Sequence, residues 1–106
     1  MTEYLQVLTT LDKKDAADRM ARKVVEKRMA ACAQVIGPIS STYWWHGKVE
    51  VSEEWLCVMK TTQGLFKELE EAVKIIHSYE IPEIIAVPIV EGHADYLDWL
   101  EKVVRR

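Results

Sequence analysis

The chain has 106 residues, 49% of them hydrophobic, and its 14 basic and 17 acidic residues give a net charge of −3. This composition fits one ordered domain over residues 1–106 and excludes a low-complexity or disordered chain. Acids and bases are interspersed, so the chain lacks the basic stripe of a nucleic-acid-binding protein. No apolar run approaches the roughly 20 residues that span a bilayer, and no secretory signal is visible, so we expect no membrane partner and a cytoplasmic location.

The N-terminal part predicts a strand followed by a helix. Residues 4–10 have the composition of a buried strand. Asp12 to Asp15 then suit a helix start, because their carboxylates meet the unpaired N–H groups there. Apolar residues recur every three or four positions until about Arg28, which is typical of an amphipathic helix. The apolar positions are Ala17, Met20, Ala21, Val24 and Val25.

A long hairpin is predicted between residues 32 and 60. Gly37-Pro38 should bend or bulge its first strand, and Gly47-Lys48 should form a tight turn with Gly at the first central position. In that register Cys57 lies opposite Pro38, and Cys32 lies roughly 20 Å further along. The sequence therefore predicts no disulfide within the chain, which agrees with a reducing compartment.

The C-terminal part predicts a helix, a strand and a last helix. Thr61 or Thr62 can cap a helix that runs to about Ile76, residues 83–90 form an apolar strand, and residues 96–104 form a short amphipathic helix. The full order is strand, helix, strand, strand, helix, strand and one appended helix. It predicts an α+β, ferredoxin-like βαββαβ sandwich, with one antiparallel sheet covered on one face by two helices.

No catalytic motif is recognisable in the sequence. There is no nucleophile elbow and no glycine-rich phosphate loop, and the three histidines stand isolated. Paired carboxylates such as Glu53-Glu54 have the pattern of surface charge. We therefore expect a protein that is not an enzyme and has no organic cofactor.

Two residues are candidate metal ligands. Cys32 is a soft ligand for copper or zinc, and His77 is a borderline one placed just after a predicted helix. The alternative for Cys32, which has alanines around it, is a small buried apolar residue. The alternative for His77 is a helix C-terminal residue favoured by the dipole. The residues alone leave both alternatives open.

The aromatic residues of the hairpin also have two interpretations. Successive side chains of a strand point to opposite faces, so Trp44 and Trp45 cannot both face the helices. One of them needs cover from another subunit, or it lines a small-molecule cleft. Lys60, close to a predicted helix start, would attract an anion there or stand as an exposed strand-end lysine.

Four blocks of residues are distinctive enough to compare with known families. They are Ala31-Cys32-Ala33, Tyr43-Trp44-Trp45-His46-Gly47-Lys48, Lys60-Thr61-Thr62 and His77-Ser78-Tyr79-Glu80-Ile81-Pro82-Glu83-Ile84. In this order, and over nearly the whole chain, they resemble the CutA family of divalent-cation tolerance proteins. The resemblance implies a ferredoxin-like protomer in a tight homotrimer, with strands extended across subunit boundaries.

The resemblance also implies a metal site. Metal ligation in the family is associated with cysteine and with the histidine before a proline-tyrosine pair, and Cys32 and His77 occupy the matching positions. Ser78 stands where the family usually has proline, which leaves His77 less rigidly placed. The implied function is a non-enzymatic, cytoplasmic homotrimer that binds copper or another divalent cation, weakly or transiently, in tolerance of and response to metal ions.

Two alternatives to a metal-binding function stay open. The family shares its architecture with the PII-type signalling trimers, which bind effectors in clefts between subunits. By that analogy, Tyr43, Trp45, Lys60 and Glu80 would hold a small ligand in an intersubunit cleft. A third possibility is a scaffold that engages another protein.

Overall fold

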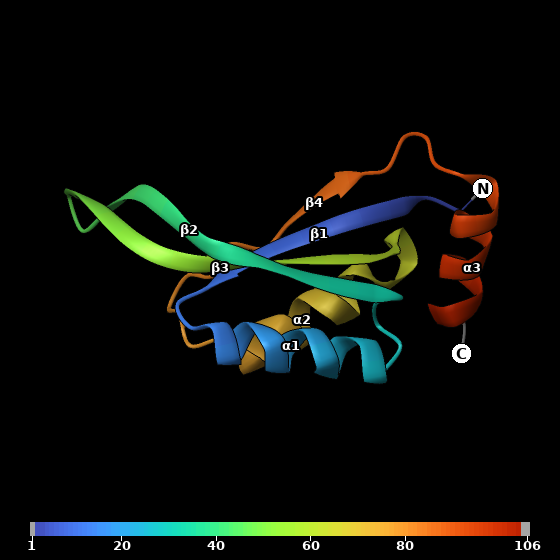
Figure 1. Ribbon diagram of the computed structural model, residues 1–106, viewed down its shortest axis with the longest axis horizontal. Helices are drawn as coiled ribbons and strands as arrows, with labels where there is room; N and C mark the ends of the chain where they lie inside the picture. Colours follow the sequence, from blue (N-terminus) through green and yellow to red (C-terminus); the bar gives the residue numbers. More distant parts are fainter. Residues whose placement is uncertain (1, 105–106) are drawn as a thin grey trace.

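The computed structural model describes residues 2–104 and forms a four-stranded antiparallel sheet with two helices on one face and a third at its end (Figure 1). The strand order is β2-β3-β1-β4. This order confirms the predicted ferredoxin-like sandwich with its appended helix. The elements are β1 (Tyr4–Leu11), α1 (Lys14–Glu26), β2 (Cys32–Trp45), β3 (Lys48–Thr62), the 3₁₀ turn η1 (Gln63–Leu65), α2 (Phe66–Ile76), β4 (Ile85–Pro88) and α3 (Ala94–Val104).

The core lies between the sheet and helices α1 and α2. Helix α1 buries an apolar stripe with the predicted spacing, and α2 buries Leu69 and Val73, both against the inward-facing residues of β1 and β3. Each large side chain buried there contributes about 1.5 to 3 kcal/mol of hydrophobic stabilisation. The central buried residues are Val7, Ala17, Met20, Val24, Cys57, Met59, Leu69 and Val73.

The predicted helix cap at Thr61 or Thr62 is wrong. Thr61 is buried in β3, where its hydroxyl donates to the carbonyl of Met29 at 2.7 Å. Thr62 precedes η1 without a side-chain cap, and α2 begins only at Phe66. The strand therefore continues through both threonines, whose β-branched side chains fit a pleated sheet.

The turn of the β2-β3 hairpin lies one residue earlier than predicted. Trp45 pairs with Lys48, so the central turn residues are His46 and Gly47. Their φ angles are 50° and 77°, which is the type I′ geometry that matches the twist of the two strands. Histidine adopts this left-handed conformation more readily than most residues do.

The predicted bulge in β2 is confirmed, and it changes the pairing of the cysteines. The register shifts between Ile36 and Ile39, around a cis Gly37-Pro38 bond. With the earlier turn, this shift places Cys57 opposite Val35 rather than Pro38, and Cys32 opposite Lys60. Both cysteines are free, as predicted.

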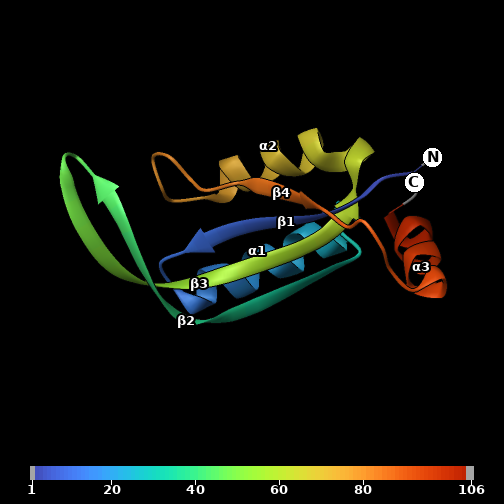
Figure 2. The same ribbon diagram turned by 90° about the horizontal axis from the view of Figure 1, so that it is seen from above.

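Two apolar surfaces of the chain have no cover. Helices α1 and α2 lie on the same side of the sheet, so the opposite face is open, and the end of the β2-β3 hairpin projects beyond them (Figures 1 and 2). Trp44 is 73% and Trp45 37% exposed, so neither packs on the helices. Exposed apolar residues on these surfaces are Ile36, Tyr43, Trp44, Trp45, Val49, Val51, Ile85 and Val87. None of the helices in residues 2–104 is long and apolar enough to cross a membrane.

Candidate functional site

Cys32 is an accessible thiol at the start of β2, an edge strand of the sheet. Its side chain is partly exposed, and its Sγ lies 3.4 Å from the hydroxyl oxygen of Tyr96 in α3. This contact, together with partial burial, raises the pKa of Tyr96 to about 12. Because Cys32 is only partly buried, the alternative interpretation of it as a small buried apolar residue does not describe this chain.

Cys57 provides the contrast. It points into the core from β3 and is completely buried. Burial, followed by the charge of Asp18, raises the pKa of its thiol to about 11. A thiol in this environment stays protonated at neutral pH, and the thiolate is the form that binds metals.

Lys60 lies beside Cys32 rather than at a helix start. The two residues are cross-strand partners, so their side chains share the open face of the sheet. The Lys60 ammonium donates to Gln34 Oε1 at 2.6 Å. Helix α2 begins at Phe66, so the structure does not place Lys60 at the N-terminus of that helix.

His77 follows α2 and is only 9% exposed, with both ring nitrogens in hydrogen bonds. Nε2 lies 2.7 Å from the carbonyl oxygen of Thr10, and Nδ1 lies 3.1 Å from the backbone nitrogen of Tyr79. A carbonyl oxygen only accepts and a backbone N–H only donates, so the proton must be on Nε2 and the lone pair on Nδ1. That lone pair is already occupied by the Tyr79 N–H.

Tyr79 also reaches a buried carboxylate in β3. Its hydroxyl donates to Glu54 Oε2 at 2.7 Å, and Glu54 is 6% exposed. Burial, and then this hydrogen bond and the charge of Glu54, raise the pKa of Tyr79 above its ordinary range. The interpretation of Glu54 as surface charge is wrong. Its neighbour Glu53 is exposed, because adjacent residues of a strand face opposite sides of the sheet. Two identical residues in a row do not show which of them faces inward.

The two predicted metal ligands are not brought together within one chain. Cys32 pairs with Lys60 near one end of the sheet, whereas His77 contacts Thr10, which pairs with Leu56. Four residues of β3 separate these positions, which is about 13 Å. Across residues 2–104, no group of three His, Cys, Asp or Glu side chains is placed to hold a metal ion. A thiol and an imidazole are ligands that a divalent metal accepts, but the described residues of one chain do not bring enough ligands together to chelate it.

The residues predicted for a small-molecule cleft are also spread over the chain. Tyr43 and Trp45 lie near the hairpin end, where the Tyr43 hydroxyl is 2.6 Å from Ser52 Oγ and the Trp45 ring meets His46 edge-on. Lys60 lies far along β3 from that end, and Glu80 is exposed on the loop after α2. A cleft that includes all four would need more than one chain.

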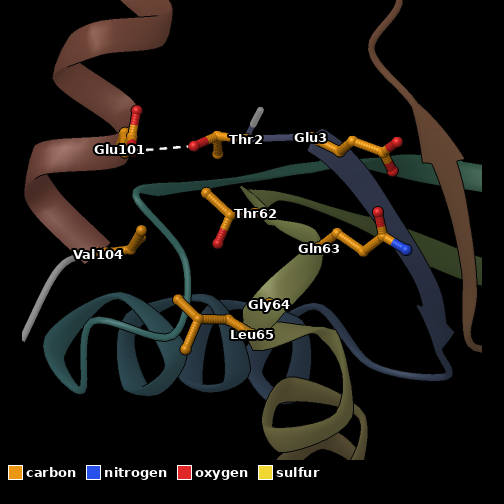
Figure 3. Close-up of a pocket in the computed structure, with 8 residues that line it drawn as sticks. All are labelled: Thr2, Glu3, Thr62, Gln63, Gly64, Leu65, Glu101 and Val104. Carbon is orange, nitrogen blue, oxygen red and sulfur yellow. Dashed lines mark hydrogen bonds between the residues drawn. The ribbon is translucent and has the colours of Figure 1, made fainter.

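A pocket of about 700 Å³ lies between α3, η1 and the start of β1 (Figure 3). Glu101 borders it and accepts hydrogen bonds from the hydroxyls of Thr2 at 3.0 Å and Tyr4 at 3.1 Å. None of the predicted site residues lines this pocket. The sequence carries no signal for this pocket, because its walls come from both ends and the middle of the chain.

Comparison with known proteins gives one family over almost the whole chain. The family described as "CutA1 divalent ion tolerance protein" matches residues 5–103. The divalent-cation tolerance protein CutA of Thermus thermophilus is 43% identical over 96 residues, covering 91% of this chain and 93% of that protein. The chloroplastic protein CutA 1 of rice is 40% identical over 93% of this chain, but the chain spans only 56% of the rice protein's length.

Solved structures agree with this comparison. The Thermus thermophilus protein superposes with a TM-score of 0.89 at 42% identity, over 96% of this chain and 97% of that one. The rice CutA1 structure gives a TM-score of 0.95 at 38% identity, over 98% and 95% of the two chains. A structure described as the periplasmic divalent cation tolerance protein CutA of Archaeoglobus fulgidus gives 0.93 at 36% identity, over 96% and 99%.

Proposed function

The chain belongs to the CutA1 divalent ion tolerance protein family, and from this premise we propose that it is a non-enzymatic homotrimer that binds divalent metal ions through Cys32. The names of its relatives refer to tolerance of divalent cations and to no reaction. Copper and zinc are the metals we propose, because a thiolate is a soft ligand that both accept.

The observation that carries the metal-binding proposal is the contrast between the two cysteines. Cys32 is partly exposed at a sheet edge, whereas Cys57 is sealed in the core. Because residues 2–104 of one chain supply no cluster of three ligands, we propose that other subunits complete the coordination of the metal at Cys32.

The uncovered surfaces support the trimer. The open sheet face and the projecting hairpin together expose aromatic and β-branched side chains that a monomer leaves in water. Exposed apolar patches of this kind are typical of protein interfaces. We propose that partner chains cover both surfaces. A small-molecule cleft lined by Tyr43, Trp45, Lys60 and Glu80 is the weaker alternative, because these four residues lie apart in the described chain.

We also propose a cytoplasmic location, because two free cysteines suit a reducing compartment. The relatives differ in this respect: the rice protein is named chloroplastic, and the Archaeoglobus structure is described as periplasmic. Location is therefore proposed from the chain's own residues.

A calorimetric titration with zinc tests the metal site, because zinc does not oxidise thiols. We expect saturable binding by the wild type and an affinity at least about tenfold lower for Cys32→Ala. Cys57→Ala is the matched control, since it removes the buried thiol and should leave the affinity unchanged. Equal affinities for the wild type and Cys32→Ala would contradict the proposal.

A further inference from the structure

His77 joins three parts of the chain through hydrogen bonds. Its backbone N–H donates to the carbonyl of Val73 at 2.9 Å, at the end of α2. Its Nε2 donates to the carbonyl of Thr10 at 2.7 Å, near the end of β1, and its Nδ1 accepts the backbone N–H of Tyr79 at 3.1 Å. The residue therefore connects the end of α2 with β1 and with the segment that leads to β4.

The connection extends to β3 through Tyr79. The Tyr79 ring lies 4.7 Å from the imidazole, and the Tyr79 hydroxyl donates to the Glu54 carboxylate at 2.7 Å. His77 holds the backbone of Tyr79, while Glu54 holds its side chain. Both His77 and Glu54 are buried, so each of these hydrogen bonds supplies a partner to a polar group that lies away from water.

The role of metal ligand that the family resemblance implies for His77 does not fit this arrangement. A histidine binds a metal ion through the lone pair of a neutral ring nitrogen. In this ring the lone pair on Nδ1 already accepts the Tyr79 N–H, and Nε2 carries the proton that Thr10 accepts. Binding a metal ion would leave one of those two backbone groups without its partner, which is costly for a buried group.

We infer that His77 is a structural connector of this chain, and that the binding of divalent metal ions does not use it. The helix dipole does not explain the residue either, because a neutral imidazole carries no charge for the dipole to attract. What places histidine here is a ring with a donor on one side and an acceptor on the other. This inference stands on the hydrogen bonds of His77 and does not depend on the metal site proposed at Cys32.

His77→Gln separates the two roles, because the amide of glutamine can donate to the Thr10 carbonyl as Nε2 does, but it has no imidazole lone pair. In a calorimetric titration with zinc, we expect its affinity to stay within about twofold of the wild type. A metal ligand would behave differently, since its replacement should lower the affinity about tenfold or more.

Thermal unfolding at one protein concentration measures the structural role. We expect His77→Ala to lower the Tm by at least about 4 °C, because it leaves two backbone groups without partners, and His77→Gln to lower it less. His93→Ala is the matched control: the His93 side chain is 77% exposed, and its removal should leave the Tm unchanged.

Nitrogen-15 NMR of the wild-type protein supplies a readout that needs no variant, because the ring shifts identify the protonated nitrogen. We expect the proton of His77 on Nε2, both without zinc and with zinc at saturation. A protonation pattern that changes with zinc would overturn the inference, as would a tenfold loss of zinc affinity in His77→Gln or an unchanged Tm in His77→Ala. Failure of the proposed function has a different signature, since it appears as equal zinc affinities for the wild type and Cys32→Ala.

Discussion

Residues of the same type have opposite environments in this chain, and burial decides which of them can take part in chemistry. Cys32 and Cys57 are both in strands, but only Cys32 is partly exposed. Glu53 and Glu54 are neighbours, but only Glu54 is buried and bound by Tyr79. The metal-binding proposal depends on these differences in burial rather than on residue type.

The buried thiol predicts that stability falls at alkaline pH. The pKa of Cys57 is about 11 in the folded protein, against an ordinary value of 9.0. The unfolded chain therefore loses this proton first, and the free energy of unfolding should fall between pH 9 and pH 11, by up to about 3 kcal/mol. Tyr79, whose pKa is also raised, should add a fall of the same sign.

Urea unfolding of the wild type and of Cys57→Ala across this pH range checks the prediction. The wild type should lose more stability on going from pH 9 to pH 11 than the variant does, since the variant has no thiol to titrate in the core. Parallel pH dependences for the two proteins would show that Cys57 does not contribute.

Among the elements, the β2-β3 hairpin differs most from a regular pair of strands. Its bulge at Gly37-Pro38 places the Gly37 backbone directly under the Trp55 ring. A Cβ added at Gly37 would stand 2.4 Å from Trp55 Cδ1, which is far inside van der Waals contact. Glycine is therefore needed at Gly37 for space rather than for a positive φ.

Gly37→Ala should lower the free energy of unfolding by about 1 to 3 kcal/mol, because the Trp55 ring must move out of its packed position. Gly64→Ala is the control, because a Cβ at Gly64 meets no atom within 4 Å. Denaturant midpoints measure both variants. Equal midpoints for the two variants would contradict the close packing of Trp55 on Gly37.

The helices and strands and their order could be predicted from the sequence, because apolar periodicity is a local property of each segment. The prediction failed for features that depend on residues far apart in the sequence. The bulge at Gly37-Pro38 was predicted, but the position of the turn depended on His46 adopting a positive φ, which sequence does not reveal. The accessibility of Cys32 depends on Tyr96, 64 positions away. The burial of Glu54 depends on Tyr79, which lies on a loop beyond α2.

On the scale of the whole molecule, large apolar side chains are exposed on the open sheet face and at the hairpin end. One face of the sheet has no helices, and the hairpin end carries two exposed tryptophans. The structure of one chain is therefore consistent with an assembly in which copies of the chain cover each other.

Trp45→Glu should dissociate the proposed trimer, because it buries a charge against apolar surface of a partner chain. Ile75→Glu is the matched control: Ile75 is also exposed, but it lies on α2, away from the open sheet face and the hairpin. Sedimentation velocity at micromolar concentration should give a trimer for the wild type and for Ile75→Glu, and smaller species for Trp45→Glu. A trimeric Trp45→Glu would show that the hairpin end lies outside the interface.

Native mass spectrometry of the wild-type protein with zinc tests the metal site and the assembly in one spectrum, with Cys32→Ala measured beside it. We expect the wild type to give a trimer mass with bound zinc, and Cys32→Ala to give the same trimer with less zinc bound. A monomer, or a Cys32→Ala trimer that retains all its zinc, would contradict the account of this protein as a homotrimer that binds metal through Cys32.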